Sequence, residues 1–417
     1  MATRSFRGDA AAIAEVDSFT PANVGIADTF TLTLNGKAVN FVATTEVVAD
    51  VTAGLTAAWL ASTEPEHLTL TPSDQTTYMD LTAKTAGRPH EVTPTETDGD
   101  ASDDQTLTKA EVTANQSPYD WNCIYNWTDD DTPDAADDVV LENSTSHVYY
   151  GLDQSAITVA TLTVKQSHTG HVGLPEWNDT YDFTEFLATY LAIGATVCTI
   201  GEGDGTGSGR IKLDFGAVQT AVTVHNSGSR ADSELPAIML KGTHAANTLT
   251  VHRGDVGVAV LAGETAVIAT LTMDYVTNLE SDAKVVCGSG ATLTTIVKSG
   301  GILAIESNVV TVTNSGGTAT IKGTATVTTL NVEGGTVYYN SSGTITNLYV
   351  TDGAHVDFSR DSRAVTVTNC YLYKGGKISD PRKRVTWTNG IDLVKCGLRK
   401  GVDLDVGSDI TITPSAI

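Results

Sequence analysis

The sequence predicts a mainly β protein: a small α+β N-terminal module, then an irregular strand region, then a right-handed-type parallel β-solenoid. Three observations support this fold class. Short runs rich in Thr and Val recur along the chain, and only one segment has a convincing helical pattern. Five similar segments follow one another in the C-terminal third, and pairs of glycines lie among them. Units this short can bury a hydrophobic face only by stacking on their neighbours.

The repeated segments set the expected register of the solenoid. They begin 17, 17, 18 and 22 residues apart, at Thr292, Val309, Thr326, Thr344 and Thr366. If successive units stack, the apolar residue at the same place in each unit faces the core. We therefore expect equivalent inward positions for Ile296, Val312, Leu330 and Leu348.

A chain of 417 residues is too long for one ordinary hydrophobic core, so we divide it into several parts. The expected parts are an N-terminal arm (1–20), a small α+β module (21–117), an irregular β region that begins the solenoid (118–290), a regular β-solenoid (291–390) and a C-terminal tail (391–417).

The module has a clear order of elements. A strand with period 2 runs from Asp28 to Asn35-Gly36, a dipeptide typical of a type I′ hairpin turn, and the return strand follows. A helix is predicted over about 46–62, because Val51, Leu55 and Trp59 fall on one face. Two more strands follow, near 68–70 and 79–83.

Two patterns resemble known structural proteins. The hairpin TFTLTLNGK (29–37), the helix segment VTAGLTAAW (51–59) and the strand LTAKTAG (81–87) resemble a module of bacteriophage and prophage structural proteins and some bacterial surface proteins. Trp121, Trp127 and the later Asp-Asp-Val-Val (137–140) look like the opening of β-solenoid regions in surface and autotransporter-like proteins. That second resemblance implies that the aromatic side chains plug the end of the stack.

The charge of the chain excludes some partners. The net charge of −25 disfavours nucleic acid and anionic membranes, which attract Lys and Arg. The charge is also uneven: residues 1–150 hold 25 acids and 6 bases, whereas residues 360–400 hold 10 bases and 3 acids. The basic residues Arg382, Lys383, Arg384, Arg399 and Lys400 are therefore our candidates for docking onto an acidic surface or a neighbouring copy, with a solvated charged end as the alternative.

Cysteines and termini point to a protein that is not secreted by a signal peptide. The five cysteines stand far apart without a CxxC pair, so we expect buried free thiols and no zinc site. The segment Met1–Asp9 lacks the apolar stretch of a signal peptide, and no run of 18 apolar residues predicts a membrane span. A virion protein made in the host cytoplasm reconciles these features with a surface-type fold.

Two segments contain residue types that bind metal ions. The acidic run 129–138 lacks the spacing of known calcium loops, and a solvated turn is expected; Asp129, Asp131 and Asp138 are the first candidates if it binds Ca²⁺. His168 and His171, with His147, have no evident further ligands, so we expect no metal there.

Two further patterns concern phosphate binding and glycan cleavage. The glycine-rich stretch 201–210 precedes a strand and lacks the Gly-Lys-Ser/Thr of a phosphate loop, so we expect a connecting loop. A glycan-cleaving site would need paired carboxylates on neighbouring coils. The acids in or beside the repeats sit singly near turns, at Glu306, Glu333, Asp352, Asp357 and Asp361.

These observations favour a non-enzymatic structural protein of a tailed-phage virion, most specifically a capsid decoration (cement) protein without cofactor. Its expected partners are the major capsid protein and itself, as a homotrimer, and neither nucleic acid nor membrane. The alternatives are a tail fibre or tailspike that binds, and perhaps cleaves, host surface glycan, or a bacterial surface adhesin. A glycan-binding flank would draw on the tyrosines of the repeats, at Tyr338, Tyr339, Tyr349, Tyr371 and Tyr373.

Overall fold

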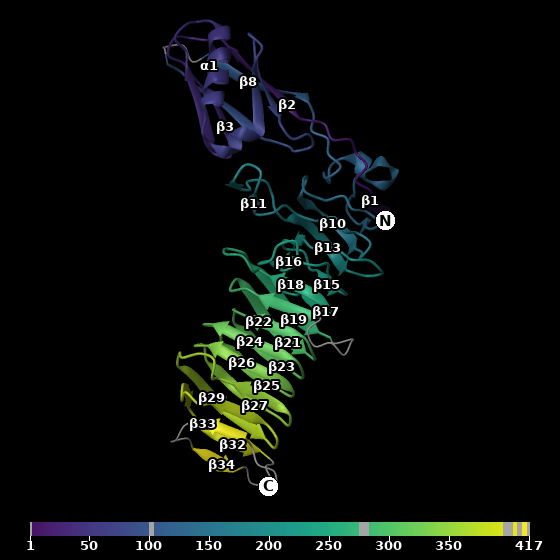
Figure 1. Cartoon of the computed structure of the whole chain (residues 1–417), viewed down its shortest axis with the longest axis vertical. Coiled ribbons are helices and arrows are strands. Elements are labelled where there is room, and N and C mark those ends of the chain that lie inside the picture. The colour runs from purple at the N-terminus through teal and green to yellow at the C-terminus, as the bar shows by residue number, and fades with distance from the viewer. Residues whose placement is uncertain (1, 100–103, 275–282, 395–402, 407–410, 415–417) are drawn as a thin grey trace.

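The computed structural model describes residues 2–99, 104–274, 283–394, 403–406 and 411–414. The chain is mainly β, as the sequence predicts, and contains a small antiparallel module and a long stack of parallel strands. Figure 1 shows the module at one end of the long axis and the C-terminus at the other. The single α-helix of the described residues has 14 residues. None of the described helices is long and apolar enough to cross a membrane.

The N-terminal module contains two antiparallel sheets and the helix. The first sheet has the order β5-β6-β2-β8 and the second the order β4-β3-β7. The elements are β2 (Val16–Ala22), β3 (Thr29–Leu34), β4 (Lys37–Val42), α1 (Val48–Ala61), the 3-10 helix η1 (Pro65–Thr69), β5 (Leu70–Asp74), β6 (Met79–Ala83), β7 (Val92–Thr97) and β8 (Thr106–Thr113).

Local sequence explains the module. The alternation in β3 places Phe30, Leu32 and Leu34 in the core at 0% exposure, and the predicted turn at Asn35-Gly36 joins β3 to β4, with positive φ at both residues. The helix buries the face that the sequence indicates, and its bounds differ by one or two residues from the expected 46–62.

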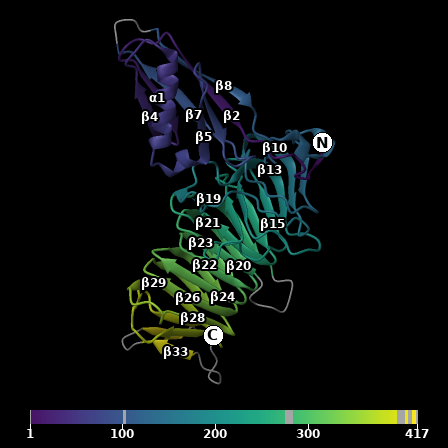
Figure 2. The ribbon, with the colours of Figure 1, turned by 45° about the horizontal axis from the view of Figure 1, so that its top comes forward.

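The first strand of the chain belongs to the solenoid. Strand β1 (Thr3–Phe6) pairs in parallel with β9 (Asp138–Leu141), and the register joins Thr3 to Asp138 and Phe6 to Leu141. The N-terminus therefore lies beside β10 rather than in the module, as Figures 1 and 2 show. The module is an insertion between two neighbouring strands of the stack, and β2 begins at Val16, within the segment expected to be an arm.

Aromatic side chains fill the end of the solenoid core. Phe6, Trp121 and Trp127 are at most 1% exposed. The rings of Phe6 and Trp127 meet edge-on with centroids 5.2 Å apart, and those of Trp121 and Trp127 with centroids 4.6 Å apart. The indole N–H of Trp127 donates to the carbonyl oxygen of Trp121 at 2.7 Å. Two 3-10 turns hold this corner, η2 (Ile124–Asn126) and η3 (Thr128–Asp130).

The solenoid consists of two ladders of parallel strands, in which each strand pairs with the equivalent strand of the next coil. The first ladder contains β1, β9, β10 (Asp153–Val164), β13 (Leu191–Ile200), β15 (Ala221–Val224), β17 (Thr248–Val251), β19 (Ala266–Met273), β21 (Ala291–Lys298), β23 (Val309–Asn314), β25 (Val327–Val332), β27 (Ile345–Val350), β29 (Val365–Tyr373), β31 (Val385–Trp387), β32 (Ile391–Val394) and β34 (Ile412–Pro414). The second ladder contains β14 (Ile211–Asp214), β16 (Ile238–Lys241), β18 (Gly254–Val258), β20 (Ala283–Cys287), β22 (Ile302–Ile305), β24 (Thr318–Gly323), β26 (Gly335–Ser341), β28 (Ala354–Asp357), β30 (Lys377–Asp380) and β33 (Asp403–Val406). A short hairpin, β11 (Trp177–Asn178) with β12 (Phe183–Thr184), projects from it.

The register within the repeats is the predicted one. Ile296 pairs with Val312, Val312 with Leu330, and Leu330 with Leu348, and all four side chains are 0% exposed. Parallel pairing already begins at β9, so the region 118–290 belongs to the same stack as the regular repeats. One hydrophobic core runs through it from Phe6 to Ile391.

The glycine pairs form a corner of the coils. Gly301, Gly317 and Gly335 have positive φ, near 70°. A Cβ on Gly317 would lie 2.3 Å from the carbonyl oxygen of Gly301, and one on Gly335 would lie 2.3 Å from that of Gly317. These corners therefore require glycine both for the backbone conformation and for close stacking of one coil on the next.

The described cysteines are free. Cys198, Cys287 and Cys370 are buried as expected, and burial raises the pKa of each thiol. Cys123 is half-buried, because it lies in the turn before η2, and Cys396 is outside the described residues.

Candidate functional site

The candidate docking residues do not share one environment. Arg382 and Lys383 are exposed on the turn between β30 and β31, whereas Arg384 is 6% exposed. Arg399 and Lys400 lie outside the described residues. The turn is near the C-terminal end of the solenoid, far from the acidic module. Of the five candidates, Arg382 and Lys383 are the ones that the structure describes as exposed.

Arg384 is held inside the chain. Its guanidinium donates to the carbonyl oxygens of Tyr339 and Arg363, the latter at 2.7 Å, and lies 3.6 Å from a carboxylate oxygen of Asp361. Hydrogen bonds from Arg363 hold the pKa of Asp361 well below its usual range. Arg384 thus joins β26 to the loop before β29, and its charge serves the fold.

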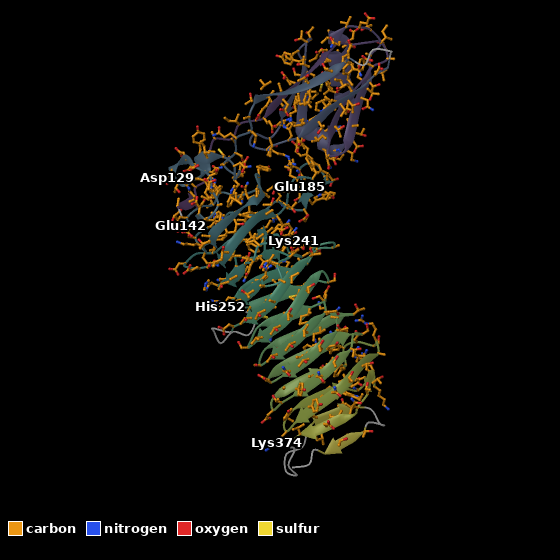
Figure 3. All side chains as sticks on the ribbon, turned by 180° about the vertical axis from the view of Figure 1, so that it is seen from behind. Asp129, Glu142, Glu185, Lys241, His252 and Lys374 are labelled. Atoms are coloured by element: carbon orange, nitrogen blue, oxygen red, sulfur yellow. The ribbon has the colours of Figure 1, made fainter. Side chains whose placement is uncertain are left out.

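The acidic run surrounds an arginine. Arg4 on β1 lies 3.8 Å from a carboxylate oxygen of Asp129, 2.5 Å from one of Asp131 and 3.5 Å from one of Asp137. Asp138 instead accepts a hydrogen bond from the hydroxyl of Thr161 at 2.7 Å. Figure 3 labels Asp129 at the N-terminal end of the solenoid. The guanidinium occupies the position that a cation would take between Asp129 and Asp131.

The three histidines lie close together without converging on one point. The rings of His147 and His171 stack in parallel with centroids 4.9 Å apart, and His147 also stacks on Tyr149 at 4.5 Å. His168 is 0% exposed. Burial lowers the pKa of both His168 and His171 to about 4, and positive charge on Arg210 adds to the effect on His171. Stacked rings direct their nitrogens side by side, an arrangement that packs coils and does not chelate.

The module contains a buried cluster of charged residues that we did not predict from the sequence. Glu15, Asp17 and His90 are the one group of potential metal ligands that converges among the described residues. The Nε2 atom of His90 lies 3.1 Å from a carboxylate oxygen of Asp17, and Nδ1 lies 3.5 Å from one of Glu15. Lys109 on β8 approaches Asp17 at 2.8 Å. The Glu-x-Asp spacing places both acids on one side of a strand, but nothing in the sequence connects them to His90 or Lys109.

This cluster has the geometry of a salt-bridge network. The imidazole lies between two carboxylates, with Nε2 facing Asp17 and Nδ1 facing Glu15. Burial opposes ionisation, but hydrogen bonds from His90 and Lys109 hold the pKa of Asp17 below its usual value. Burial raises the pKa of Glu15. The network ties β2, β8 and the segment before β7 together.

A second buried ion pair clamps the module to the solenoid. One guanidinium nitrogen of Arg88 lies 3.0 Å from both carboxylate oxygens of Glu185, and the side chains are 10% and 3% exposed. The guanidinium also lies 5.9 Å from the ring centroids of Phe183 and Phe186. Phe186 packs against the module core, and Figure 3 labels Glu185 beside this junction. The ion pair and these ring contacts connect the module to the solenoid.

A groove of about 220 Å³ lies at the same junction. We call it the junction groove. Its lining combines aromatic, amide and carboxylate side chains with apolar ones: Pro89, Asn122, Tyr149, Tyr150, Gly151, Leu152, Asp153, Leu187 and Ala188. Aromatic rings beside amide and carboxylate groups are the chemistry that binds sugar rings.

Most of the carboxylates that are candidates for glycan cleavage pair with, or accept hydrogen bonds from, residues near them. Glu306 lies 3.8 Å from Lys322, and Glu333 accepts a hydrogen bond from Ser315. Asp357 accepts from the backbone N–H of Ser359 at 2.7 Å, which closes a turn. Asp361 pairs with arginine, and Asp352 is exposed beside Gly375.

Comparisons with known protein families, curated proteins and solved structures returned no match to this chain.

Proposed function

We propose that the chain is a non-enzymatic structural protein of a tailed-phage virion, and specifically a capsid decoration protein. It is made in the host cytoplasm and binds the major capsid protein as a homotrimer. The observation that carries the proposal is the uninterrupted core from Phe6 to Ile391, which makes the chain an elongated rod. Such a rod suits a projecting surface element, and the resemblance of the module to phage structural modules indicates the particle.

The distribution of charge supports docking by one end. Residues 360–400 carry a net charge of +7, so the remainder of the chain carries −32. The exposed Arg382 and Lys383 lie near the C-terminal end, opposite the acidic module. A basic end can approach an acidic capsid floor while the acidic remainder keeps the particle soluble.

The test is to count copies. Purified particles from the source organism are digested, and peptides of this chain are quantified against those of the major capsid protein by mass spectrometry. A decoration protein gives on the order of hundreds of copies, whereas a tail part gives roughly three to eighteen, since tails follow threefold and sixfold symmetry. Absence of the chain from the particles overturns the proposal.

The junction groove favours one second candidate, a tail fibre or tailspike that binds host surface glycan. Calorimetry with purified host polysaccharide tests it. Binding lost in Tyr149→Ala but kept in Tyr371→Ala, a tyrosine on the distant β29, supports the glycan candidate. Release of sugar ends that disappears on replacing Glu306 or Asp357 would show a tailspike enzyme. Neither binding nor release is expected of a decoration protein.

A further inference from the structure

Six successive strands of the first ladder share an outer surface without charge. These strands are β19, β21, β23, β25, β27 and β29, and Figure 1 shows how they follow one another along the long axis. Their residues that are not buried number 22: four each from β19 and β21, three each from β23, β25 and β27, and five from β29. We call this surface the threonine face. It consists of Val267, Ala269, Thr270, Thr272, Thr292, Thr294, Thr295, Val297, Val310, Thr311, Thr313, Thr328, Thr329, Asn331, Thr346, Asn347, Tyr349, Thr366, Thr368, Asn369, Tyr371 and Tyr373.

Twelve of these 22 residues are threonine, and none is charged. Charged residues are 18% of the chain, so a random set of this size would hold about four, and an exposed set more. The one charge within the six strands, Lys298, points inward at 0% exposure and donates to Asn314 at 3.0 Å. The second ladder of the same coils does expose charge, at Lys284 and Lys322 among others. Neutrality is therefore a property of this face and not of the coils.

The face is also regular. Thr270, Thr295, Thr311 and Thr329 form one column across four coils in parallel register. Adjacent strands in such a ladder are about 4.8 Å apart, so the hydroxyl and methyl groups repeat at that interval. Two apolar side chains project near the centre, Val297 at 43% and Val310 at 50% exposure.

We propose that the threonine face is the surface on which copies of this chain pack side by side. Each copy carries a net charge of −25, so contact between the acidic parts of two copies brings like charges together, whereas this face brings none. Its 22 residues match the roughly 20–30 residues per partner of a stable interface. Columns of β-branched side chains with hydroxyl groups can interdigitate and hydrogen-bond with an identical surface.

A second copy fits this face better than a glycan does. Sugar rings bind to exposed aromatic rings, and on this face aromatic residues occur only in β27 and β29. Of these, Tyr349 and Tyr371 stack on each other with centroids 4.8 Å apart. The four coils from β19 to β25 offer threonine, valine, alanine and asparagine alone. Self-association of the purified chain is expected whether or not the chain belongs to a virion.

The experiment measures self-association of the full chain by sedimentation velocity over a range of concentrations. Val310→Asp and Val310→Lys place a charge of either sign at the centre of the face. Ile302→Asp and Ile302→Lys are matched controls, because Ile302 is 39% exposed on the second ladder. Both Val310 variants should weaken association at least about tenfold, as expected for a central interface position. Both Ile302 variants should associate like the parent, and thermal melting checks that all four remain folded.

Comparing Val310→Asp with Val310→Lys distinguishes loss of packing from a change in the net charge of the chain. Disruption by both Val310→Asp and Val310→Lys indicates loss of a packed neutral contact, whereas disruption by Asp alone indicates general repulsion and overturns the proposal. Association of the parent should strengthen as salt rises, because salt screens the repulsion between acidic copies. A parent that stays monomeric at all concentrations and salts also overturns it. A Thr328→Lys variant, which also places a charge on the threonine face, should associate less than the parent; normal association of this variant would overturn the proposal too. Association that persists when the chain proves absent from virions would refute the proposed function alone.

Discussion

Two buried side chains, His168 and Arg384, allow tests of how single residues affect the stability of the chain. His168 is 0% exposed, and neither of its ring nitrogens has a hydrogen-bond partner among the described residues. Its pKa of about 4 lies below the ordinary value of 6.5, so the folded chain holds it neutral where the unfolded chain takes up a proton. The stability that His168 contributes is therefore present above about pH 6.5 and is lost as the pH falls towards 4.

The corresponding prediction compares the parent with His168→Leu. The shift corresponds to a loss on the order of 3 kcal/mol between neutral pH and ~pH 4. The Leu variant removes a buried polar ring without partners, so it should match or exceed the parent in stability at neutral pH and lose less on acidification. Denaturant unfolding at several pH values measures the stability at neutral pH and its loss on acidification. Parallel pH profiles for parent and variant would contradict the assignment.

Arg384 gives a second prediction at this scale. Arg384→Ala leaves the carbonyl oxygens of Tyr339 and Arg363 without their donor in a buried site. Removing one partner of a buried charge contact costs about 3 kcal/mol or more. Arg382→Ala, on the exposed turn beside it, should change stability by less than about 0.5 kcal/mol. Equal unfolding midpoints for the two variants would show that Arg384 is not structural.

At the scale of elements, the repeats make the sharpest prediction. Leu330 faces the core at 0% exposure between Val312 and Leu348, so Leu330→Asp buries an unpaired charge at a cost of several kcal/mol. Loss of the cooperative melt of the solenoid by circular dichroism is expected. Ile302→Asp, at an exposed position of the second ladder, is the control and should melt like the parent. A normal melt for Leu330→Asp would mean that the register is wrong.

The register of the repeats could be predicted because the same local sequence pattern recurs in every coil. Short units with glycine corners recur at nearly constant spacing, so Ile296 and Leu348 could be aligned by counting. The pairing of β1 with β9 could not be found that way, because four residues carry no period and their partner lies 135 positions away. Arg384 was misleading for another reason: a basic run looks the same in sequence whether its side chains meet solvent or carbonyl oxygens.

For the whole molecule, the uneven charge predicts how the chain meets a capsid. Since Arg384 is needed inside the fold, the docking test uses Arg382→Glu with Lys383→Glu and leaves Arg384 unchanged. Binding of the parent to undecorated capsids should weaken as salt rises, because the Debye length falls to roughly 3 Å at 1 M. The double reversal should slow binding at low salt, since charges chiefly set orientation and association rate. Exposed pairs add only about 0–1 kcal/mol each, so apolar contacts supply most of the affinity.

The salt dependences of the two contacts have opposite signs. Docking through basic residues weakens with salt, whereas packing through a neutral face strengthens. Measuring both in one salt series distinguishes them without any further variant. A double reversal that binds capsids as fast as the parent would leave Arg382 and Lys383 as a solvated turn.

The position of β1 bears on how the chain is built during synthesis. Chains emerge from the ribosome N-terminus first, and domains fold as they appear. Strand β1 is therefore made before the module, and the module, once folded, holds the two ends of its own segment near each other. When β9 emerges, it can pair with β1, which has already been made. Each later coil then pairs with the coil made before it. Strand β1 thus serves as the template for β9, and the solenoid extends in one direction from that pair.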